Sequence, residues 1–286
     1  AELPIVHAIA LGDGDPFAPT EARGAPPALA VGEAVSIAPE VELVVERSSH
    51  AGRLLELTAA CDHAAFFRAL YAAGRPIQYA YVARPLSLYH VQTGFSSRPW
   101  AAEMPSAGRP LSWRTLGALR KKGVVVARLT HGAGISSTGS DALDATFPLP
   151  ERYEIPIETA EAVVRARQRG GRVVAAGTTV VRALESAALA ADGSVRAGRG
   201  EARLVLGPDT ERRVVDAVLT GIHEAGTSHH RLLAAFAPPE LLDRALARAE
   251  GDGFTIHEFG DSMLVVGSPP GAPRVTLPDR SATIAA

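Results

Sequence analysis

The stretch that most constrains the fold runs from Gly170 to Ala188 and reads as a strand, a turn and a helix. Two glycines open an apolar, β-branched run over residues 172–176, which is typical of a buried strand. Gly177–Thr179 form the turn, and from Val180 onward apolar side chains recur at helical spacing. The sequence therefore predicts a strand–turn–helix unit whose helix groups its polar side chains on a separate face, at Arg182, Glu185 and Ser186.

The turn of this unit is a candidate anion site. The first N–H groups of a helix lack intrahelical partners, and that end of the helix carries a partial positive charge. The hydroxyls of Thr178 and Thr179 stand beside them. Carboxylates and phosphates bind readily at such a position. Taken alone, the pattern fits an ordinary connection between a strand and a helix equally well.

The composition is that of a globular protein without a general electrostatic attraction for nucleic acid. The chain has 286 residues, of which 47% are hydrophobic, and its net charge is −2. One short segment is nonetheless basic, with Arg109, Arg114, Arg120, Lys121, Lys122 and Arg128. A solvated helix face is the simpler interpretation of this segment, and contact with phosphates is the alternative.

Cysteine content and hydropathy limit the other classes. Cys61 is the single cysteine, which excludes an internal disulfide and a cysteine-based zinc site. No apolar run approaches the ~18 residues of a membrane span. Glu2 stands where a signal peptide would carry positive charge. We therefore expect no membrane partner and a cytoplasmic setting. The lack of an initial Met is typical of a sequence without its first residues.

Strand and turn signals predict two domains. Residues 1–78 predict a small, β-rich, barrel-like domain, with a hairpin from runs at 41–47 and 53–58 and a helix capped by Asp62. Residues 79–286 alternate helix and strand, which predicts a larger α/β catalytic domain. Besides the central unit, we expect helices over 112–123, 156–170, 228–237 and 239–250, and strands over 124–129, 203–206, 254–257 and 263–266.

Common catalytic signatures do not assign a function. Residues 104–108 lack the first glycine of a Gly-x-Ser-x-Gly elbow. His223, His229 and His230 do not have a spacing typical of metal ligands, so surface or hydrogen-bonded histidines are favoured. The chain also lacks a Gly-x-Gly-x-x-Gly run opening a helix and a Walker lysine.

Seven short motifs nonetheless occur in a characteristic order. They are Gly74–Tyr79 (Gly-Arg-Pro-Ile-Gln-Tyr), Pro105–Gly108 (Pro-Ser-Ala-Gly), Gly132–Gly134 (Gly-Ala-Gly), Glu151–Pro156 (Glu-Arg-Tyr-Glu-Ile-Pro), Gly177–Ser186 (Gly-Thr-Thr-Val-Val-Arg-Ala-Leu-Glu-Ser), Val215–Thr220 (Val-Asp-Ala-Val-Leu-Thr) followed by His223, and Phe259–Leu264 (Phe-Gly-Asp-Ser-Met-Leu). In this order the series resembles the S-adenosylmethionine:tRNA ribosyltransferase-isomerase family of queuosine biosynthesis. The resemblance covers Gly74 to Val266 well and the residues before Gly74 only loosely. The family's segment ahead of its barrel is absent from the printed sequence.

The resemblance implies both a fold and a reaction. The fold is a large α/β domain with an inserted antiparallel β-barrel, of which residues 1–78 would be most. The reaction moves the ribosyl group of S-adenosylmethionine to 7-aminomethyl-7-deazaguanine at the wobble position of tRNA and gives epoxyqueuosine. Adenine and methionine leave, and no metal takes part. S-adenosylmethionine is then the co-substrate and tRNA the partner.

The implied chemistry selects candidate residues. Proton-handling candidates are His223, Glu151 and Asp261, and Arg182 stands one turn into the helix, where it would clamp a carboxylate. Asp261 also fits a simple turn cap, and Glu151 fits a pair with Arg152. Expected substrate-binding residues are Tyr79, Ser106, Gly108, His131, Gly132, Gly134, Gly177, Thr178, Thr179, Thr227 and Ser228.

The sequence departs from the family's pattern in three places. His131 is shifted by one position from the histidine of the family's His-Val-Gly-x-Gly run, which on a strand would turn it to the other face. Leu149 replaces a histidine, and Gly221–His229 replaces the usual Asn-Phe-His-Leu-Pro-x-Ser-Thr-Leu while keeping His223. Two alternatives therefore stay open: the same donor chemistry on a small-molecule or other base acceptor, or a non-catalytic RNA-binding relative.

Overall fold

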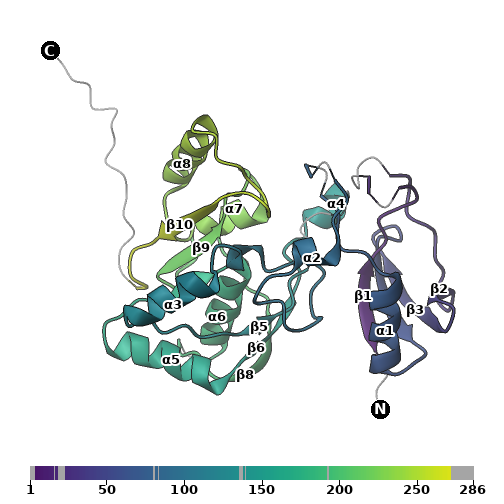
Figure 1. Cartoon of the computed structure of the whole chain (residues 1–286), viewed down its shortest axis with the longest axis horizontal. Helices are drawn as coiled ribbons and strands as arrows, with labels where there is room; N and C mark the ends of the chain where they lie inside the picture. Colours follow the sequence, from purple (N-terminus) through teal and green to yellow (C-terminus); the bar gives the residue numbers. More distant parts are fainter. Residues whose placement is uncertain are drawn as a thin grey trace. The chain divides into compact units, whose positions relative to one another are not determined.

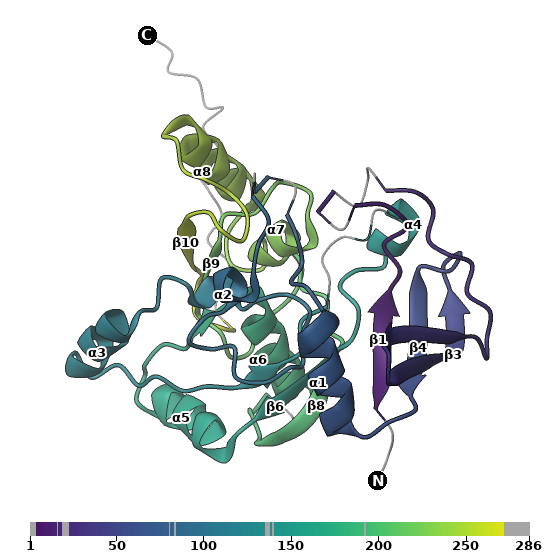
Figure 2. The same ribbon diagram turned by 45° about the vertical axis from the view of Figure 1, so that its right-hand side comes forward.

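The computed structural model describes residues 4–15, 17–18, 23–79, 81–82, 84–134, 138, 140–191 and 193–271. The chain divides into two compact units, and Figures 1 and 2 label most of their helices and strands. Unit 1 contains residues 1–92 and 135–147, and unit 2 contains residues 93–134 and 148–286. Residues 79–92 and 135–147 therefore fold with the first unit, although the sequence analysis assigns them to the α/β domain.

Unit 1 is built on an open antiparallel sheet. β1 (Ile5–Ile9), β4 (Leu54–Ala59), β3 (Val41–Ser49) and β2 (Ala34–Ala38) lie side by side in that order. Within the described residues β1 and β2 are the edges and do not pair with each other, so the expected barrel-like closure is not confirmed. Helix α1 (His63–Ala73) and the sheet share one core, and the unit also holds α2 (Leu88–Val91) and α4 (Asp141–Asp144).

The predicted hairpin of unit 1 is confirmed. Ser49 pairs with Leu54 across β3 and β4, and His50, Ala51 and Gly52 between them all have positive φ angles. Asp62 caps α1 as predicted, because its carboxylate accepts the Ala65 N–H at 2.7 Å. Local turn and capping chemistry explains both results.

A long-range hydrogen bond joins Thr138 to this sheet. The Arg53 guanidinium, in the hairpin turn, donates to the carbonyl oxygens of Ala10 and Thr138 at 3.3 and 3.1 Å. Thr138 is fully buried, and its hydroxyl donates to the Asp144 carboxylate at 2.6 Å. Such contacts join residues far apart in the sequence, which is why the turn and strand signals did not predict them.

Unit 2 contains two three-stranded sheets. In one, β10 (Ser262–Val266), β9 (Ala217–Gly221) and β7 (Val174–Ala176) lie in that order, with β7 parallel to β9. In the other, β5 (Thr130–His131), β6 (Glu151–Ile155) and β8 (Gly198–Ala202) are antiparallel. The helical elements are η2 (Ser106–Gly108), α3 (Trp113–Lys121), α5 (Ile157–Gln168), α6 (Thr178–Ala190), α7 (Ser228–Leu233) and α8 (Pro239–Gly251). Mixed helix and strand with several sheets is thus the observed class.

Helix α6 is the centre of unit 2, as Figure 1 shows. Every residue from Val181 to Ala188 is buried, including the polar side chains of its other face. The Glu185 carboxylate accepts three backbone N–H groups, from Arg213, Val214 and Val215, at 2.7–3.1 Å. A buried carboxylate is tolerated there because its oxygens are hydrogen-bonded.

Three predicted strands are wrong. Residues 124–129 form none in the structure, and Val125 is 73% exposed, whereas strand propensity favours half-buried positions. The strand expected at 203–206 lies instead at β8, where Gly200 makes room for the Tyr153 side chain: a Cβ there would lie 2.6 Å from the tyrosine Cζ. Residues 254–257 form a tight loop, in which Asp261 accepts the Thr255 N–H at 2.9 Å.

The predicted helices agree better with the structure. α3, α5 and α8 lie where they were expected, and Ser112 caps α3 by accepting the Thr115 N–H at 3.1 Å. α7 ends at Leu233, earlier than predicted. None of the helices in the described ranges is long and apolar enough to cross a membrane.

Candidate active site

A small pocket in unit 2 gathers side chains from two of the seven sequence motifs and from helix α7. Its polar wall is formed by Glu151 of β6, three residues of α6 and two of α7: Thr178, Thr179, Arg182, Ser228 and His229. Apolar side chains that include Val205, Leu206 and Leu232 complete the wall. The cavity measures about 30 Å³. That is room for one or two ordered waters.

The predicted turn at the start of α6 forms one side of this pocket. Gly177 has φ +105° and donates its N–H to the Leu219 carbonyl of β9 at 2.8 Å, so the turn is fixed to the sheet. A Cβ on Gly177 would lie 3.6 Å from the Cβ of Ala107, which places the Ser106–Gly108 turn beside it. Gly108 in turn packs under Phe95, whose ring leaves no space for a Cβ. Two predicted binding motifs are thereby adjacent.

Arg182 is the most enclosed charge of the pocket. Its guanidinium pairs with the Glu151 carboxylate and donates to the carbonyl oxygens of Leu149, Ala202 and Leu204 at 2.9–3.2 Å. The residue is only 4% exposed. With these partners the guanidinium does not have two free N–H groups on one edge, so a bidentate clamp on a ligand carboxylate would require Glu151 to leave. The alternative pairing of Glu151 with Arg152 is wrong, because Arg152 stacks on Trp100 at 4.4 Å.

Besides Arg182, the Glu151 side chain contacts two of the predicted substrate-binding residues, Gly134 and His131. Its carboxylate accepts the Gly134 N–H at 2.9 Å and lies 3.3 Å from Nε2 of His131. The one-residue shift of His131 therefore does not remove it from the site. Both ring nitrogens of His131 are buried without a hydrogen-bond partner among the described residues, since the approach to Glu151 lacks hydrogen-bonding geometry. Gly132 lies between the Trp100 carbonyl and the Arg152 side chain.

Burial is the main cause of the shifted pKa values of Glu151 and His131. It raises the pKa of the Glu151 carboxyl, against the smaller opposite effects of Arg182 and of the Gly134 N–H. Burial, assisted by the nearby positive charge of Arg182, lowers the pKa of His131 to about 4. His131 is therefore neutral at physiological pH, and Glu151 is a carboxyl whose pKa burial shifts upward.

A group of histidines lies beside the pocket. The His223 ring follows β9 and stacks on the His229 ring, with centroids 4.8 Å apart. Nε2 of His223 is 2.7 Å from the Thr220 hydroxyl. Burial, followed by the proximity of His229, His230 and His257, lowers the pKa of His223 to about 3. His223 itself does not line the pocket.

The loop after α8 supports this histidine group. His257 has φ +75°, an unusual conformation for a residue with a side chain, and its N–H donates to the Ile222 carbonyl at 3.1 Å. Gly260 is required because a Cβ would collide with the carbonyl oxygens of Thr255 and Ile256. Asp261 is exposed, and it accepts from the N–H and hydroxyl of Thr255. Its contacts are those of a turn cap.

The remaining predicted residues have separate positions. Thr227 caps α7 by accepting the His230 N–H at 3.2 Å, while its neighbour Ser228 reaches the pocket. Tyr79 belongs to unit 1, where its ring lies 5.6 Å from that of Tyr81. Among the described residues, no group of three or more His, Cys, Asp or Glu side chains is arranged to hold a metal ion.

His229 is the pocket residue that the sequence analysis missed. Neither a surface position nor a hydrogen bond describes it, because its ring lines the cavity and stacks on His223. The one sequence signal for His229 was its position two residues after the N-cap Thr227, which places it in the first turn of a helix. That signal did not indicate which part of the fold the first turn of α7 would face.

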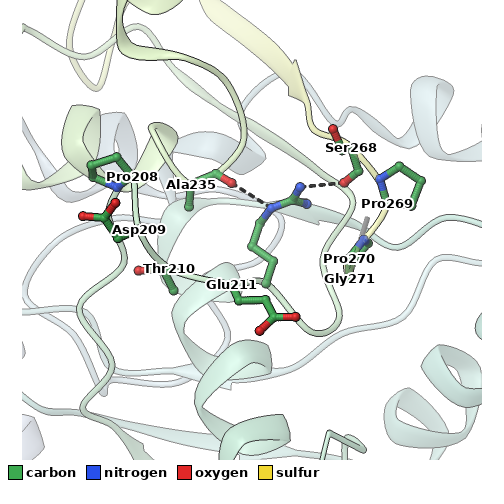
Figure 3. Close-up of a pocket in the computed structure, with 10 residues that line it drawn as sticks. Pro208, Asp209, Thr210, Glu211, Ala235, Ser268, Pro269, Pro270 and Gly271 are labelled. Carbon is green, nitrogen blue, oxygen red and sulfur yellow. Dashed lines mark hydrogen bonds between the residues drawn. The ribbon is translucent and has the colours of Figure 1, made fainter. Parts of the chain in front are cut away.

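A larger cavity of about 340 Å³ lies elsewhere in unit 2 and contains none of the predicted residues. Figure 3 shows its wall, formed by residues 208–212, Ala235 and residues 268–271. The Arg212 guanidinium is held there by the carbonyl oxygens of Ala235 and Ser268, at 2.9 and 2.6 Å. The smaller pocket is the better candidate site, because it alone of the two combines acid–base side chains with a helix N-terminus.

The basic segment forms an exposed surface on unit 2. Its six arginine and lysine side chains are all exposed, on α3 and the chain to either side of it. Trp113, at the start of α3, is 69% exposed. The Arg128 guanidinium lies 5.6 Å from the Phe95 ring centroid and 6.0 Å from that of Trp113.

Comparison with known proteins gives one consistent family. The family described as "Queuosine biosynthesis protein" matches residues 21–265. S-adenosylmethionine:tRNA ribosyltransferase-isomerases from Sorangium cellulosum and Thiobacillus denitrificans are 42% and 39% identical over 62% and 61% of this chain. These matches cover 48% and 51% of the relatives, so the chain spans about half their length.

One solved structure is also similar to this chain. The crystal structure of S-adenosylmethionine tRNA ribosyltransferase from Thermotoga maritima matches with a TM-score of 0.47 and 24% identity. The match covers 82% of this chain and 65% of that one.

Proposed function

Because this chain belongs to the queuosine biosynthesis protein family, we propose that it transfers the ribosyl group of S-adenosylmethionine to 7-aminomethyl-7-deazaguanine in tRNA. The product is epoxyqueuosine, and adenine and methionine leave. The observation that carries the proposal is the pocket, which combines Glu151 and Arg182 with the Thr178–Thr179 turn and the start of α7. Residues of separate motifs are thereby assembled around one cavity.

The start of α6 is proposed to hold the methionine carboxylate of the donor. The helix has 13 residues, its N-terminal N–H groups face away from the helix body, and two threonine hydroxyls stand beside them. The fixed charge of Arg182 lies one turn further along and attracts the same anion at longer range. Binding would not need the guanidinium to leave Glu151.

Glu151 is proposed to donate a proton to the departing adenine. Burial raises the pKa of its carboxyl, and a raised pKa favours the role of proton donor. Adenine then leaves as a neutral base. The positive sulfonium of the donor makes the neighbouring C5′–H acidic, so a second group that accepts a proton is also needed.

The cavity is too small for the whole donor. Sites for molecules of this size measure ~300–1,000 Å³, far more than the roughly 30 Å³ found here. The proposal therefore requires side chains at the pocket's mouth to move when S-adenosylmethionine binds. We assign this adjustment to α7, a short helix that contributes Ser228 and His229.

The basic segment is proposed to contact tRNA. Exposed arginine and lysine side chains bind phosphates, and an exposed tryptophan offers a surface on which a base can stack. The overall charge of −2 makes such binding depend on this local surface.

The decisive experiment is incubation of the chain with S-adenosylmethionine and tRNA that carries the aminomethyl-deazaguanine. Adenine release detected by chromatography, together with a mass increase on the tRNA, is the expected result. If adenine is released with the free deazaguanine base but not with the tRNA, the acceptor is a small molecule and not tRNA. A chain that binds tRNA and never releases adenine would be a non-catalytic relative.

A further inference from the structure

The more exposed of the two tryptophans stands in the most basic segment of the chain. Trp113, at the start of α3, is 69% exposed. Between Glu103 and Asp141 the sequence has six arginine and lysine residues and no aspartate or glutamate, so this stretch carries +6 in a chain whose net charge is −2. An exposed ring contributes little to folding, because the hydrophobic effect depends on the area removed from water. This surface therefore suits a ligand that is both anionic and aromatic.

The Arg128 guanidinium contacts two aromatic rings on this surface. It lies 6.0 Å from the Trp113 ring centroid and 5.6 Å from that of Phe95, within the range of cation–π interactions. The backbone of Arg128 is anchored, because its carbonyl oxygen accepts the hydroxyl of Thr159, a buried residue of α5. The Trp113 ring is thus supported by a side chain whose backbone is held in place, while most of the tryptophan stays open to solvent.

Phe95 connects this aromatic group to the candidate active site. Its ring packs so closely on Gly108 that a Cβ there would lie 2.6 Å from the ring carbon Cδ2. The turn that contains Gly108 also lies beside Gly177, because a Cβ on Gly177 would be 3.6 Å from the Cβ of Ala107. Gly177 is the N-cap of α6, whose first residues line the pocket. Trp113 itself does not line the pocket, so the two sites are joined by packing and remain separate.

We propose that Trp113 is a subsite for one unpaired nucleotide of the RNA, whose base stacks on the indole ring. The identification of that RNA as tRNA rests on the proposed function. The nucleotide at Trp113 is a neighbour of the reacting one, because the acid–base side chains lie in the pocket and not at Trp113. It must be unpaired, since the bases of a duplex are already stacked on both faces, whereas a base in a single-stranded loop can lie on an aromatic side chain.

Helix α3 offers a path for the phosphates that follow this base. Gly117 lies one turn after Trp113 on the same face of the helix, and a Cβ there would meet nothing within 4 Å. A sugar–phosphate chain can therefore approach the helix closely at this point. Arg120 and Lys121, both exposed, lie one turn further along. Stacking on Trp113 would thus place the neighbouring phosphates near these cations.

The two tryptophans of the chain allow a direct test in the full-length protein. Trp100→Phe leaves Trp113 as the only tryptophan, and titration with an RNA stem–loop should then quench its fluorescence. A fully paired RNA duplex with the same number of phosphates should bind through the cations without this quenching. Equal quenching by the duplex, or none by the stem–loop, would overturn the proposal.

Affinity measurements separate stacking from charge. Trp113→Ala should weaken stem–loop binding by about 5–150-fold, the factor that corresponds to one base–aromatic stack. Duplex affinity and the salt dependence of binding should not change, because no phosphate contact is lost. Trp113→Phe keeps an aromatic ring and should retain most of the affinity. Tyr89→Ala, at an 86% exposed residue of α2 in unit 1, is the matched control and should bind like wild type. Equal weakening of both RNAs by Trp113→Ala would mean that the ring is not a stacking site.

Turnover distinguishes this inference from the proposed function. With the tRNA that carries the aminomethyl-deazaguanine, Trp113→Ala should raise KM for tRNA and leave kcat and the KM for S-adenosylmethionine unchanged. Adenine release with an unchanged KM for tRNA would overturn the subsite while the proposed function stands. If the wild-type protein releases no adenine, the proposed function fails, and the fluorescence titration still decides whether Trp113 stacks on an unpaired base.

Discussion

Arg182 and Glu185 lie three residues apart on α6, both buried, and they attach the helix to different parts of unit 2. The Arg182 guanidinium binds Glu151 of β6 and the Ala202 carbonyl of β8. The Glu185 carboxylate binds the backbone N–H groups of residues 213–215, which lead into β9. The two charges therefore fix the N-terminus of α6, and with it the Thr178–Thr179 turn, relative to both sheets.

Glu151→Gln should abolish most activity without unfolding the chain. Glu151 uses one oxygen to pair with Arg182 and the other to accept the Gly134 N–H, so the single oxygen of glutamine keeps one of these contacts, and the amide does not hold a transferable proton. Turnover should fall by about 10²–10⁴-fold, measured as adenine release.

Glu154→Gln is the matched control for this change. Glu154 lies on the same strand but pairs with Arg98 and Arg199 outside the pocket. Equal losses in the two variants would exclude a specific role for Glu151.

Gly177→Ala should destabilise the chain because this residue has φ +105°, where a side chain is strained. The expected loss is about 1–3 kcal/mol of unfolding free energy, measured by urea denaturation. Gly117→Ala, on exposed α3 where a Cβ meets nothing within 4 Å, should instead be neutral or stabilise by about 0.5–1 kcal/mol. Loss of stability in both variants would contradict a conformational cause at Gly177.

Stability should fall with acid because His131 is buried in its neutral form. Its pKa is about 4 in the folded chain and ~6.5 when unfolded, so between these values the unfolded state binds more protons. Unfolding free energy therefore rises with pH across this window and is lost as pH falls through it, by at most about 1.4 kcal/mol per pH unit for this one group.

His131→Gln should flatten this dependence in denaturation curves recorded between pH 4 and 7. His63→Gln, at an exposed residue of α1, should leave it unchanged. An unaltered slope in His131→Gln would mean that other groups cause the acid sensitivity.

Changing Lys121 and Lys122 together to Glu should weaken tRNA binding and leave S-adenosylmethionine affinity unchanged. Each lost phosphate contact also reduces the salt dependence of binding by about one unit of slope. Filter binding at several salt concentrations measures both effects. Changing Arg244 and Arg248 on α8 to Glu provides a control with the same change of charge. An equal effect in this control would mean that the two lysines do not contact tRNA and only form a solvated helix face.

The sequence by itself determined the local units of this protein. The strand–turn–helix around Gly177, the hairpin before Leu54, and the caps at Asp62 and Ser112 were all predicted, because each depends on residues within one or two turns of chain. The motif series also gave the family, which the match over residues 21–265 confirms.

Only the tertiary structure decided which side chains meet. Pairing of Glu151 with Arg182, the glycine-rich strand β8 under Tyr153, and the place of His229 in the pocket all join residues far apart in the sequence. Such contacts depend on how the sheets and α6 pack, and local propensity is overridden wherever burial and pairing contribute more free energy. For this reason the sequence named Glu151, Arg182 and Thr178 as candidates, while the fold was needed to show that His229, and not His223, faces the same cavity.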